Sequence, residues 1–510
     1  MDSATQQKKA IWMTERSSGV LIAISSLPSR YGIGTLGKAA YAFADFLKKA
    51  GQRYWQLLPI GPTGFGDSPY QSFSTFAGNP YFIDLELLAE EGLLSAAELD
   101  AVDWGGDPAR VDYGKLYDNR FRFLRQACEN GWARDAAEIA RFSGENSWLR
   151  DYALFMALKR HFHMLPWTEW PDADIRLHRP EAVARYEALL ADDVRLFTYI
   201  QYVFFRQWDA LRDYVHGLGI RLIGDLPIYV ALDSADVWAE PEQFQLDAEN
   251  RPTAVAGCPP DAFSEDGQLW GNPLYDWERM RQDGYGWWIR RFGGAARLFD
   301  AVRIDHFRGL ESYWSVPCGA ETAKEGQWVK GPGMAFVGVL TGWFSGTEII
   351  AEDLGYLTPE VRQLLRDSGL PGMKVLEFAF DPREPSDYLP HNYDKNCVCY
   401  IGTHDNPPVR AWIREMDRET LALARQYLGA ERSEDLLPAL IRAGMGSVAS
   451  LFVLQMQDLL GLGAESRMNT PATAEGNWQW RMLPGAATDT LAEKLRRTTA
   501  LYGRLARPVE

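Results

Sequence analysis

Eight short apolar runs, each ending abruptly in polar residues, dominate the hydrophobic pattern. Most of them lack strict alternation, which is typical of parallel strands covered on both faces. The last run is also compatible with a helix. The runs are Val20–Leu27, Tyr54–Ile60, Ile220–Leu226, Ala301–Phe307, Glu348–Leu354, Lys374–Phe380, Val398–Asn406 and Ser450–Asp458.

Stretches with helical spacing separate these runs. Lys38–Ala50 follows the first run and Pro359–Leu370 follows the fifth. Alternation of about eight strands with helices predicts an α/β fold, a (β/α)8 TIM barrel. A chain of 510 residues suits one large catalytic barrel with insertions.

Two segments are predicted to be insertions into the barrel. A mostly helical subdomain, about 85–217, lies between the second and third runs, and Ser147–Phe162 and Pro180–Val215 are its clearest helices. A second insertion, about 231–290, contains the Pro- and Gly-rich segment Val255–Trp277, which has no clear periodicity. A long loop of this kind in a compact domain is usually functional or mobile.

The net charge and the hydropathy of the chain disfavour some classes of binding partner. A formal net charge of −16 disfavours binding to nucleic acid. No apolar run reaches membrane-spanning length, and Met1–Gly19 has no apolar core of a signal peptide. The 19 tryptophans fit either a large core or stacking surfaces for sugar rings, and composition does not choose between them.

The cysteine pattern points to a reducing compartment. The five cysteines are few, scattered and odd in number, which predicts a cytoplasmic protein. We interpret all five as buried thiols, because no second Cys or His pair gives a zinc-like spacing. No metal and no cofactor is expected.

Three carboxylates at the ends of predicted strands carry the candidate chemistry: Asp305, Glu352 and Asp405. Catalytic residues of a barrel lie at the C-terminal ends of its strands. Retaining glycoside chemistry uses one carboxylate as a nucleophile and a second carboxyl group as acid and base. Arg303 points to the same face as Asp305 and would keep it ionised. Alternatively, Arg303 and Asp305 form a structural ion pair and Glu352 caps a helix.

Further polar residues occur at the same strand ends. Asp225, His306, Asp353 and His404 each lie within the last three residues of one of these runs. Each of them also has a structural interpretation, as a turn cap or an ordinary hydrogen-bonded side chain.

Several blocks of sequence resemble one enzyme family. RIDHFRG (303–309), IIAEDLG (349–355) and GTHDN (402–406) look like the catalytic strand motifs of the 4-α-glucanotransferases, the amylomaltases or disproportionating enzymes related to α-amylases. The resemblance runs from near Gly19 to near Leu462, with GNWQWR (476–481) beyond it. Long blocks in the expected order make this signal far more specific than any single motif.

The resemblance implies roles for the strand-end residues. Asp305 would be the nucleophile, Glu352 the general acid and base, and Asp405 the residue that grips sugar hydroxyls and stabilises the distorted ring. The donor sugar would be bound by Arg303, His306, His404 and Asp225.

The resemblance also implies a glucan groove. One of Tyr54 and Trp55 would face sugar, and we favour Tyr54. Phe263 would shield an acceptor site from water, although some relatives carry an aromatic pair where this chain has Ala262 and Phe263. The other expected groove residues are Asp67, Ser68, Tyr70, Trp270 and Asn272.

The implied activity is transfer of an α-1,4-glucan segment to the 4-hydroxyl of another glucan or of glucose, by a retaining double displacement without a cofactor. The expected partners are α-1,4-glucans and maltooligosaccharides, with glucose as an acceptor. An α-amylase-like hydrolase would share every catalytic residue and is the main alternative. A glucan-binding protein on an inactive barrel and a phosphate-handling barrel are weaker ones.

Overall fold

A computed structural model describes residues 15–64, 66–260, 264–355, 357–383, 385–473 and 475–505. Its centre is an eight-stranded parallel sheet with the order β10-β11-β12-β1-β2-β3-β6-β9. The main-chain N–H of Ala351 donates to the Pro371 carbonyl (2.9 Å) and links the two ends of this order, so the sheet is a nearly closed barrel. The strands are β1 (Ser17–Leu21), β2 (Tyr54–Gln56), β3 (Arg221–Leu226), β6 (Ala301–Ile304), β9 (Glu348–Ala351), β10 (Gly372–Val375), β11 (Cys397–Tyr400) and β12 (Leu451–Gln455).

The barrel confirms the predicted fold class, and each apolar run overlaps one strand. The last run was compatible with either a strand or a helix, and the structure shows one of each. β12 ends at Gln455, and α18 (Met456–Leu460) begins at the next residue. The strands are shorter than the runs. The polar residues that end the runs therefore lie in the turns beyond the strands, where side chains can face a site.

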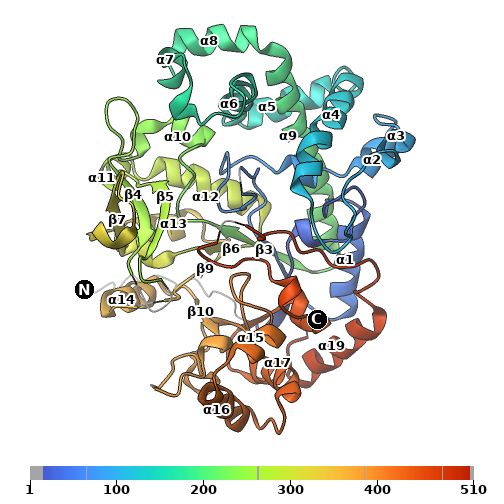
Figure 1. Ribbon diagram of the computed structural model, residues 1–510, viewed down its shortest axis with the longest axis vertical. Helices are drawn as coiled ribbons and strands as arrows, with labels where there is room; N and C mark the ends of the chain where they lie inside the picture. The colour runs from blue at the N-terminus through green and yellow to red at the C-terminus, as the bar shows by residue number, and fades with distance from the viewer. Residues whose placement is uncertain are drawn as a thin grey trace, which may run out of the picture.

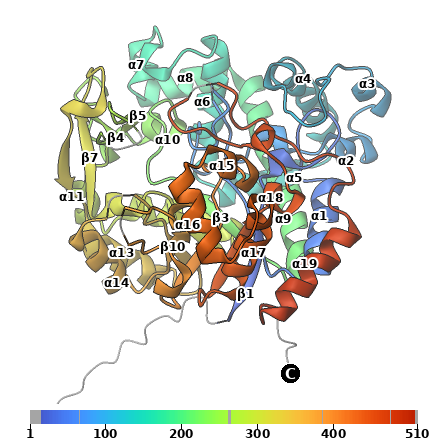
Figure 2. The same cartoon turned by 60° about the horizontal axis from the view of Figure 1, so that its bottom comes forward.

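Helices cover the outside of the barrel (Figures 1 and 2). The predicted helices Lys38–Ala50 and Pro359–Leu370 are confirmed as α1 (Lys38–Lys49) and α14 (Pro359–Ser368). The Thr358 side chain caps the first turn of α14, and Gly369 ends it at φ +68°. The remaining outer helices are α12 (Gly286–Leu298), α13 (Gly333–Trp343), α15 (Val409–Glu415), α16 (Arg418–Leu428), α17 (Leu436–Gly446) and α19 (Asp489–Leu501).

The chain between β2 and β3 is helical. Pro180–Val215 is two helices rather than one, because the chain leaves helical geometry at Leu190 (φ −108°, ψ 26°) and a new helix starts with Asp192 and Asp193 in its first turn. The helices are α2 (Leu85–Glu90), α3 (Ala96–Asp100), α4 (Tyr113–Gly131), α5 (Ala136–Glu145), α6 (Leu149–His161), α7 (Ala173–Arg176), α8 (Pro180–Leu189) and α9 (Ala191–Gly217).

A second sheet corrects the loop interpretation of Val255–Trp277. This segment contributes β4 (Ala254–Cys258) and β5 (Gln268–Pro273) to an antiparallel sheet of order β5-β4-β7-β8. Its partners β7 (Ser312–Pro317) and β8 (Gln327–Lys330) come after β6 in the chain. The local sequence pattern of Val255–Trp277 therefore could not predict that β4 pairs with β7. The sheet stands on the opposite side of the molecule from α2–α4 in both views (Figures 1 and 2). Short helices α10 (Ala235–Ala239) and α11 (Trp277–Gln282) flank it in the chain.

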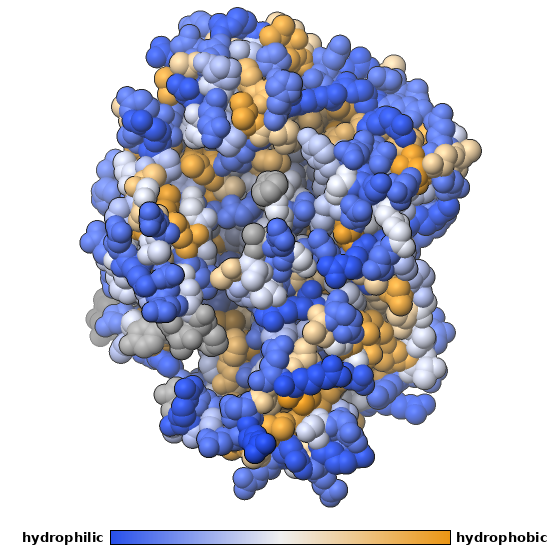
Figure 3. Space-filling view, viewed as in Figure 1, coloured by the Kyte–Doolittle hydropathy of each residue, from blue (hydrophilic) through white to orange (hydrophobic). Residues whose placement is uncertain are grey.

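The surface and the cysteines bear on the predictions about membrane spans and buried thiols. Hydrophilic residues dominate the face drawn in Figure 3, with scattered hydrophobic patches. Among the residues that the structure describes, no helix is long and apolar enough to cross a membrane. Cys128, Cys397 and Cys399 are buried, but Cys318 is exposed and Cys258 is half-buried, so the prediction of five buried thiols is wrong for these two. Both lie at ends of the antiparallel strands, which the sequence did not reveal.

Candidate active site

One arginine holds two of the predicted carboxylates. Arg303 lies on β6 inside the barrel, and its Nη1 donates to Asp225 Oδ1 (2.7 Å) and Oδ2 (2.8 Å) and to Asp305 Oδ1 (2.8 Å). Arg303 and Asp225 are fully enclosed, whereas the Asp305 side chain keeps 29% of its surface exposed. Burial raises the pKa of Asp225, and Arg303 opposes that shift. Asp305 is therefore the carboxylate of this cluster that a ligand can reach.

Glu352 follows β9 and is buried in the same cluster. Its Oε2 accepts the main-chain N–H of His306 (2.7 Å) and its Oε1 accepts that of Leu354 (2.8 Å). Burial raises the pKa of Glu352 to about 7, the nearby cation of Arg303 lowers it, and the charge of Asp305 raises it. A carboxyl group with this pKa can both donate and accept a proton near neutral pH.

The backbone at His306 connects the two carboxylates. His306 has φ +53° and ψ +48°, a left-handed conformation that is uncommon for a residue other than glycine. This conformation turns the residue after Asp305 so that its N–H meets Glu352. Burial lowers the pKa of the His306 ring to about 4, so the ring is neutral near pH 7. Strain at this position is consistent with a functional site.

His404 and Asp405 lie in the turn beyond β11. The His404 ring stacks on Tyr70, with 5.2 Å between ring centroids, and the Tyr70 hydroxyl donates to Asp225 Oδ2 (2.7 Å). Asp405 Oδ1 accepts the side-chain amide of Asn469 (2.6 Å). The Asp405 side chain is 45% exposed, beside the buried His404. Tyr70 thus joins the β11 turn to the Arg303 cluster.

The antiparallel sheet supplies another wall. Trp270 on β5 meets the His306 ring edge-on, with 4.9 Å between centroids. Asn272 is buried and donates to the Val230 carbonyl (2.8 Å), and it accepts from Gln71 (3.4 Å). Trp270 is therefore half-buried against the cluster, while the contacts of Asn272 fix β5 to the loop beyond β3.

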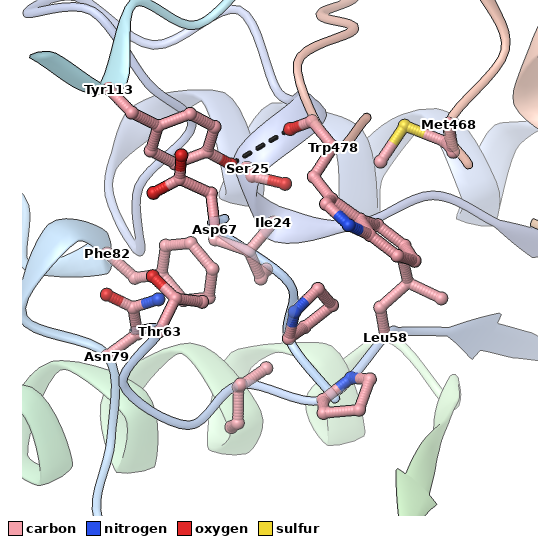
Figure 4. Close-up of a pocket in the computed structure, with 14 residues that line it drawn as sticks. Ile24, Ser25, Leu58, Thr63, Asp67, Asn79, Phe82, Tyr113, Met468 and Trp478 are labelled. Carbon is pink, nitrogen blue, oxygen red and sulfur yellow. Dashed lines mark hydrogen bonds between the residues drawn. The ribbon is translucent and has the colours of Figure 1, made fainter. Parts of the chain in front are cut away.

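Asp67 and Ser68 shape the loop after β2. Asp67 is left-handed at φ +58°, and burial raises its pKa to about 6. Ser68 Oγ accepts the Tyr70 N–H (3.3 Å), so it supports Tyr70. Asp67 also lines a small pocket of about 20 Å³ together with Tyr113 and Trp478, in which the Tyr113 hydroxyl donates to the Trp478 carbonyl (Figure 4).

The structure contradicts the prediction that Tyr54 faces sugar. Tyr54 is the first residue of β2, and its hydroxyl donates to Glu348 Oε2 (3.0 Å) and accepts from Arg221 Nη1 (3.2 Å). Glu348 and Arg221 are the first residues of β9 and β3, so Tyr54 lies at the N-terminal end of the barrel, opposite the candidate site. Its neighbour Trp55 is fully buried and donates to the Ile22 carbonyl. Neither member of the pair faces sugar. Phe263 lies outside the described residues.

The segment beyond β12 supplies residues that the sequence did not identify. Asn469 holds the Asp405 carboxylate, and Arg467 donates to the Asp405 carbonyl (3.0 Å). Trp478 contacts both Tyr70 and His404, with centroids 5.8 and 6.0 Å apart. The block GNWQWR was a signal for Trp478, but nothing in the local pattern distinguished Arg467 or Asn469.

The described residues of the site offer no ligand set for a metal ion. Within the described ranges, no group of three or more His, Cys, Asp and Glu side chains is arranged to hold a metal ion. The arrangement offers instead an accessible carboxylate, a carboxyl group with a raised pKa, and aromatic walls. These are the components of acid/base and nucleophilic chemistry on a sugar.

Comparisons with known proteins agree with this geometry. A family model described as 4-alpha-glucanotransferase matches residues 22–487. A 4-alpha-glucanotransferase of Clostridium butyricum is 47% identical, covering 94% of this chain and 99% of the relative, and one of Thermus thermophilus is 48% identical, covering 96% and 99%. The solved structure of an amylomaltase from Streptococcus agalactiae in complex with acarbose has a TM-score of 0.94 at 41% identity, covering 96% of this chain and 100% of that one. A match over nearly the whole chain, on the same barrel fold, means that this chain belongs to the 4-alpha-glucanotransferase family, glycoside hydrolase family 77.

Proposed function

We propose that the chain transfers segments of α-1,4-glucan by a retaining double displacement, with Asp305 as nucleophile and Glu352 as general acid and base. The observation that carries the proposal is the pairing of an arginine-held, accessible Asp305 with a buried Glu352 whose pKa is raised to about 7. Two carboxyl groups in different protonation states are what this chemistry requires.

In the first step, Glu352 gives its proton to the glycosidic oxygen while Asp305 attacks the anomeric carbon. The bond between that carbon and the leaving oxygen breaks, and the reducing-end fragment departs with the proton. A glycosyl ester on Asp305 remains. Arg303 Nη1 donates to Asp305 Oδ1 (2.8 Å) and so holds the attacking carboxylate in place.

In the second step, the 4-hydroxyl of an acceptor glucan or glucose attacks the same carbon. Glu352, now ionised, takes the hydroxyl proton, and Asp305 leaves as a carboxylate. Two inversions restore the α configuration, and no electron or phosphate is moved. We assign Asp405 to the hydroxyls of the donor sugar, with Asn469 fixing its carboxylate.

The substrate-binding proposal follows from the walls of the site. Tyr70, His404 and Trp270 offer ring faces and edges near the cluster, which suits the C–H faces of glucose rings. We propose linear α-1,4-glucans and maltooligosaccharides as donors, with glucose among the acceptors. The small and odd number of cysteines supports a reducing compartment such as the cytoplasm.

Incubation with pure maltotriose tests the transfer reaction. We expect glucose plus a ladder of longer maltooligosaccharides, at a constant number of reducing ends. A steady rise in reducing ends without longer products would establish a hydrolase. The E352Q variant is the control for contaminating activity, because it keeps the shape of the site and removes the acid.

A further inference from the structure

Two buried carboxyl groups flank the turn that carries His404 and Asp405. Glu377 lies in the 3-10 turn Leu376–Phe378, directly after β10, and Asp458 lies in α18, directly after β12. Strand β11 runs between β10 and β12. The two acids therefore approach the turn from both sides.

Both acids contact the turn closely. The Glu377 N–H donates to the Ile401 carbonyl (3.0 Å). A Cβ at Gly402 would lie 3.0 Å from Glu377 Oε1, so the carboxyl group packs tightly against the main chain of the turn there. Asp458 Oδ1 accepts the N–H of Val409 (2.8 Å), at the start of α15. The turn is thus held at its beginning by Glu377 and at its end by Asp458.

Most of the carboxyl oxygens lack a well-placed hydrogen-bond donor. Glu377 is 7% exposed and Asp458 is 1% exposed. Within the part of the chain that the structure describes, Glu377 Oε1, Glu377 Oε2 and Asp458 Oδ2 are buried with no donor in good hydrogen-bond geometry. The Asn406 side chain lies near Glu377 and lowers its pKa, but burial and the charge of Asp458 outweigh this effect. Two ionised carboxylates in this state would be costly, because burial removes their hydration and their charges repel each other.

The charged groups around the pair do not neutralise it. Glu377 faces Asp458 from α18 and Glu415 from α15, both negative, and Arg467 from the segment beyond β12. Arg467 donates to the carbonyls of Asp405 and Asn469 rather than to either carboxylate. Burial, and then the charge of Asp458, raises the pKa of Glu377 well above its usual range, and burial raises the pKa of Asp458 to about 7.

We infer that Glu377 and Asp458 form a positioning pair that retains a proton at neutral pH and thereby keeps the turn bearing His404 and Asp405 in its active geometry. The inference rests on the proposed function for the role of Asp405. Neither acid touches the reacting atoms. On ionisation the proton passes to solvent, and the second negative charge must draw in water or move the turn.

Thermal unfolding against pH tests the retained proton without using activity. Between the unfolded carboxyl pKa of about 4.3 and the higher folded value, the folded state holds a proton that the unfolded chain has released. Stability contributed by the pair is therefore present at low pH and is lost as pH rises. E377Q and D458N keep the shape and remove one titration. We expect the Tm of each variant, relative to the natural chain, to rise by about 1–4 °C between about pH 5 and about pH 9.

The matched control is E419Q, a substitution of an exposed glutamate on α16, whose Tm difference from the natural chain should stay constant with pH. Infrared difference spectra give an independent readout. The C=O band of a protonated carboxyl group at neutral pH should weaken in E377Q or D458N and persist in E419Q. Parallel Tm curves for all four proteins, with an unchanged carboxyl band, would overturn the inference.

Kinetics separate positioning from a general structural effect. E377Q should keep kcat within about twofold, because the neutral amide replaces a neutral acid, whereas E377A should lose about tenfold or more by leaving the turn unsupported. Equal losses in E377Q and E377A would contradict the pair. Failure of the proposed function would appear elsewhere: D405N would keep full activity while the Tm and infrared results stood.

Discussion

The two ends of one barrel hold similar side chains in different proportions. At the N-terminal end, Arg221 forms an ion pair with Glu348 (2.8 Å), with Asp300 also nearby, and the Tyr54 hydroxyl bonds to Arg221 and Glu348. At the C-terminal end, Arg303 faces Asp225, Asp305 and Glu352. A tyrosine takes part at each end, Tyr54 in one and Tyr70 in the other.

The two clusters differ in burial and in the number of carboxylates that the arginine contacts. At the N-terminal end, Arg221 and Glu348 form a single ion pair whose side chains are 29% and 16% exposed, and this pair stabilises the barrel. At the C-terminal end, Arg303 and Asp225 are enclosed, and burial together with the charge of Asp305 raises the pKa of Glu352 to about 7. The same barrel interior thus carries an ion pair at one end and, at the other, the two carboxyl groups that we propose as nucleophile and acid/base.

The largest expected effect is the loss of activity in D305N and E352Q. E348Q, the matched variant at the N-terminal end, should show no comparable loss. E352Q should lower kcat by about 10²–10⁴-fold, because the leaving oxygen loses its proton donor. D305N should be at least as severe, because no ester can form. Added azide should restore the turnover of an activated glucosyl donor by E352Q. The product would be a glucosyl azide, which mass spectrometry detects. Equal loss in E348Q would mean that the two ends are not distinct.

The next effect is on the pH profile. Glycosyl transfer needs protonated Glu352, so kcat/KM should fall as pH rises through about 7. Arg303 lowers the pKa of Glu352, so R303L should move this alkaline limb to higher pH, besides lowering kcat. R221L is the matched variant at the other end: it should lower the Tm and leave the limb in place. A limb that stays fixed in R303L would break the electrostatic comparison.

A smaller effect is expected beside the cluster, at Asn469. Removing the amide in N469A leaves the Asp405 carboxylate without its 2.6 Å donor. A hydrogen bond to a charged group contributes about 1.5–3 kcal/mol, so kcat/KM for maltotriose should fall by about 10–100-fold. N469A should keep its Tm within a few degrees of the natural chain. Full activity in N469A would remove Asn469 from the site.

The smallest effect sharpens the correction at Tyr54. Y54F loses two hydrogen bonds in the N-terminal cluster and should destabilise the fold by about 1–2 kcal/mol, seen in urea unfolding, with kcat and KM within about twofold. Y70F removes the hydroxyl that binds Asp225 and should lower kcat/KM. If Y54F raised KM strongly and Y70F did not, the assignment of the two tyrosines would be reversed.

The sequence by itself determined the barrel and the carboxylates that we propose to be catalytic. Each strand overlaps a local apolar run, and polar residues follow it in the chain, so the placement of Asp305, Glu352 and Asp405 beyond strand ends could be predicted from the sequence pattern. The resemblance to the family added their roles.

Only the tertiary structure decided which residues meet across the barrel. Tyr54 and Tyr70 are chemically alike and close in the chain, and the direction of β2 sends one to each end. The antiparallel sheet joins segments on both sides of β6, and Asn469 reaches Asp405 from beyond the last strand. Local patterns record burial but not long-range partners, because a contact depends on where the fold brings the second residue.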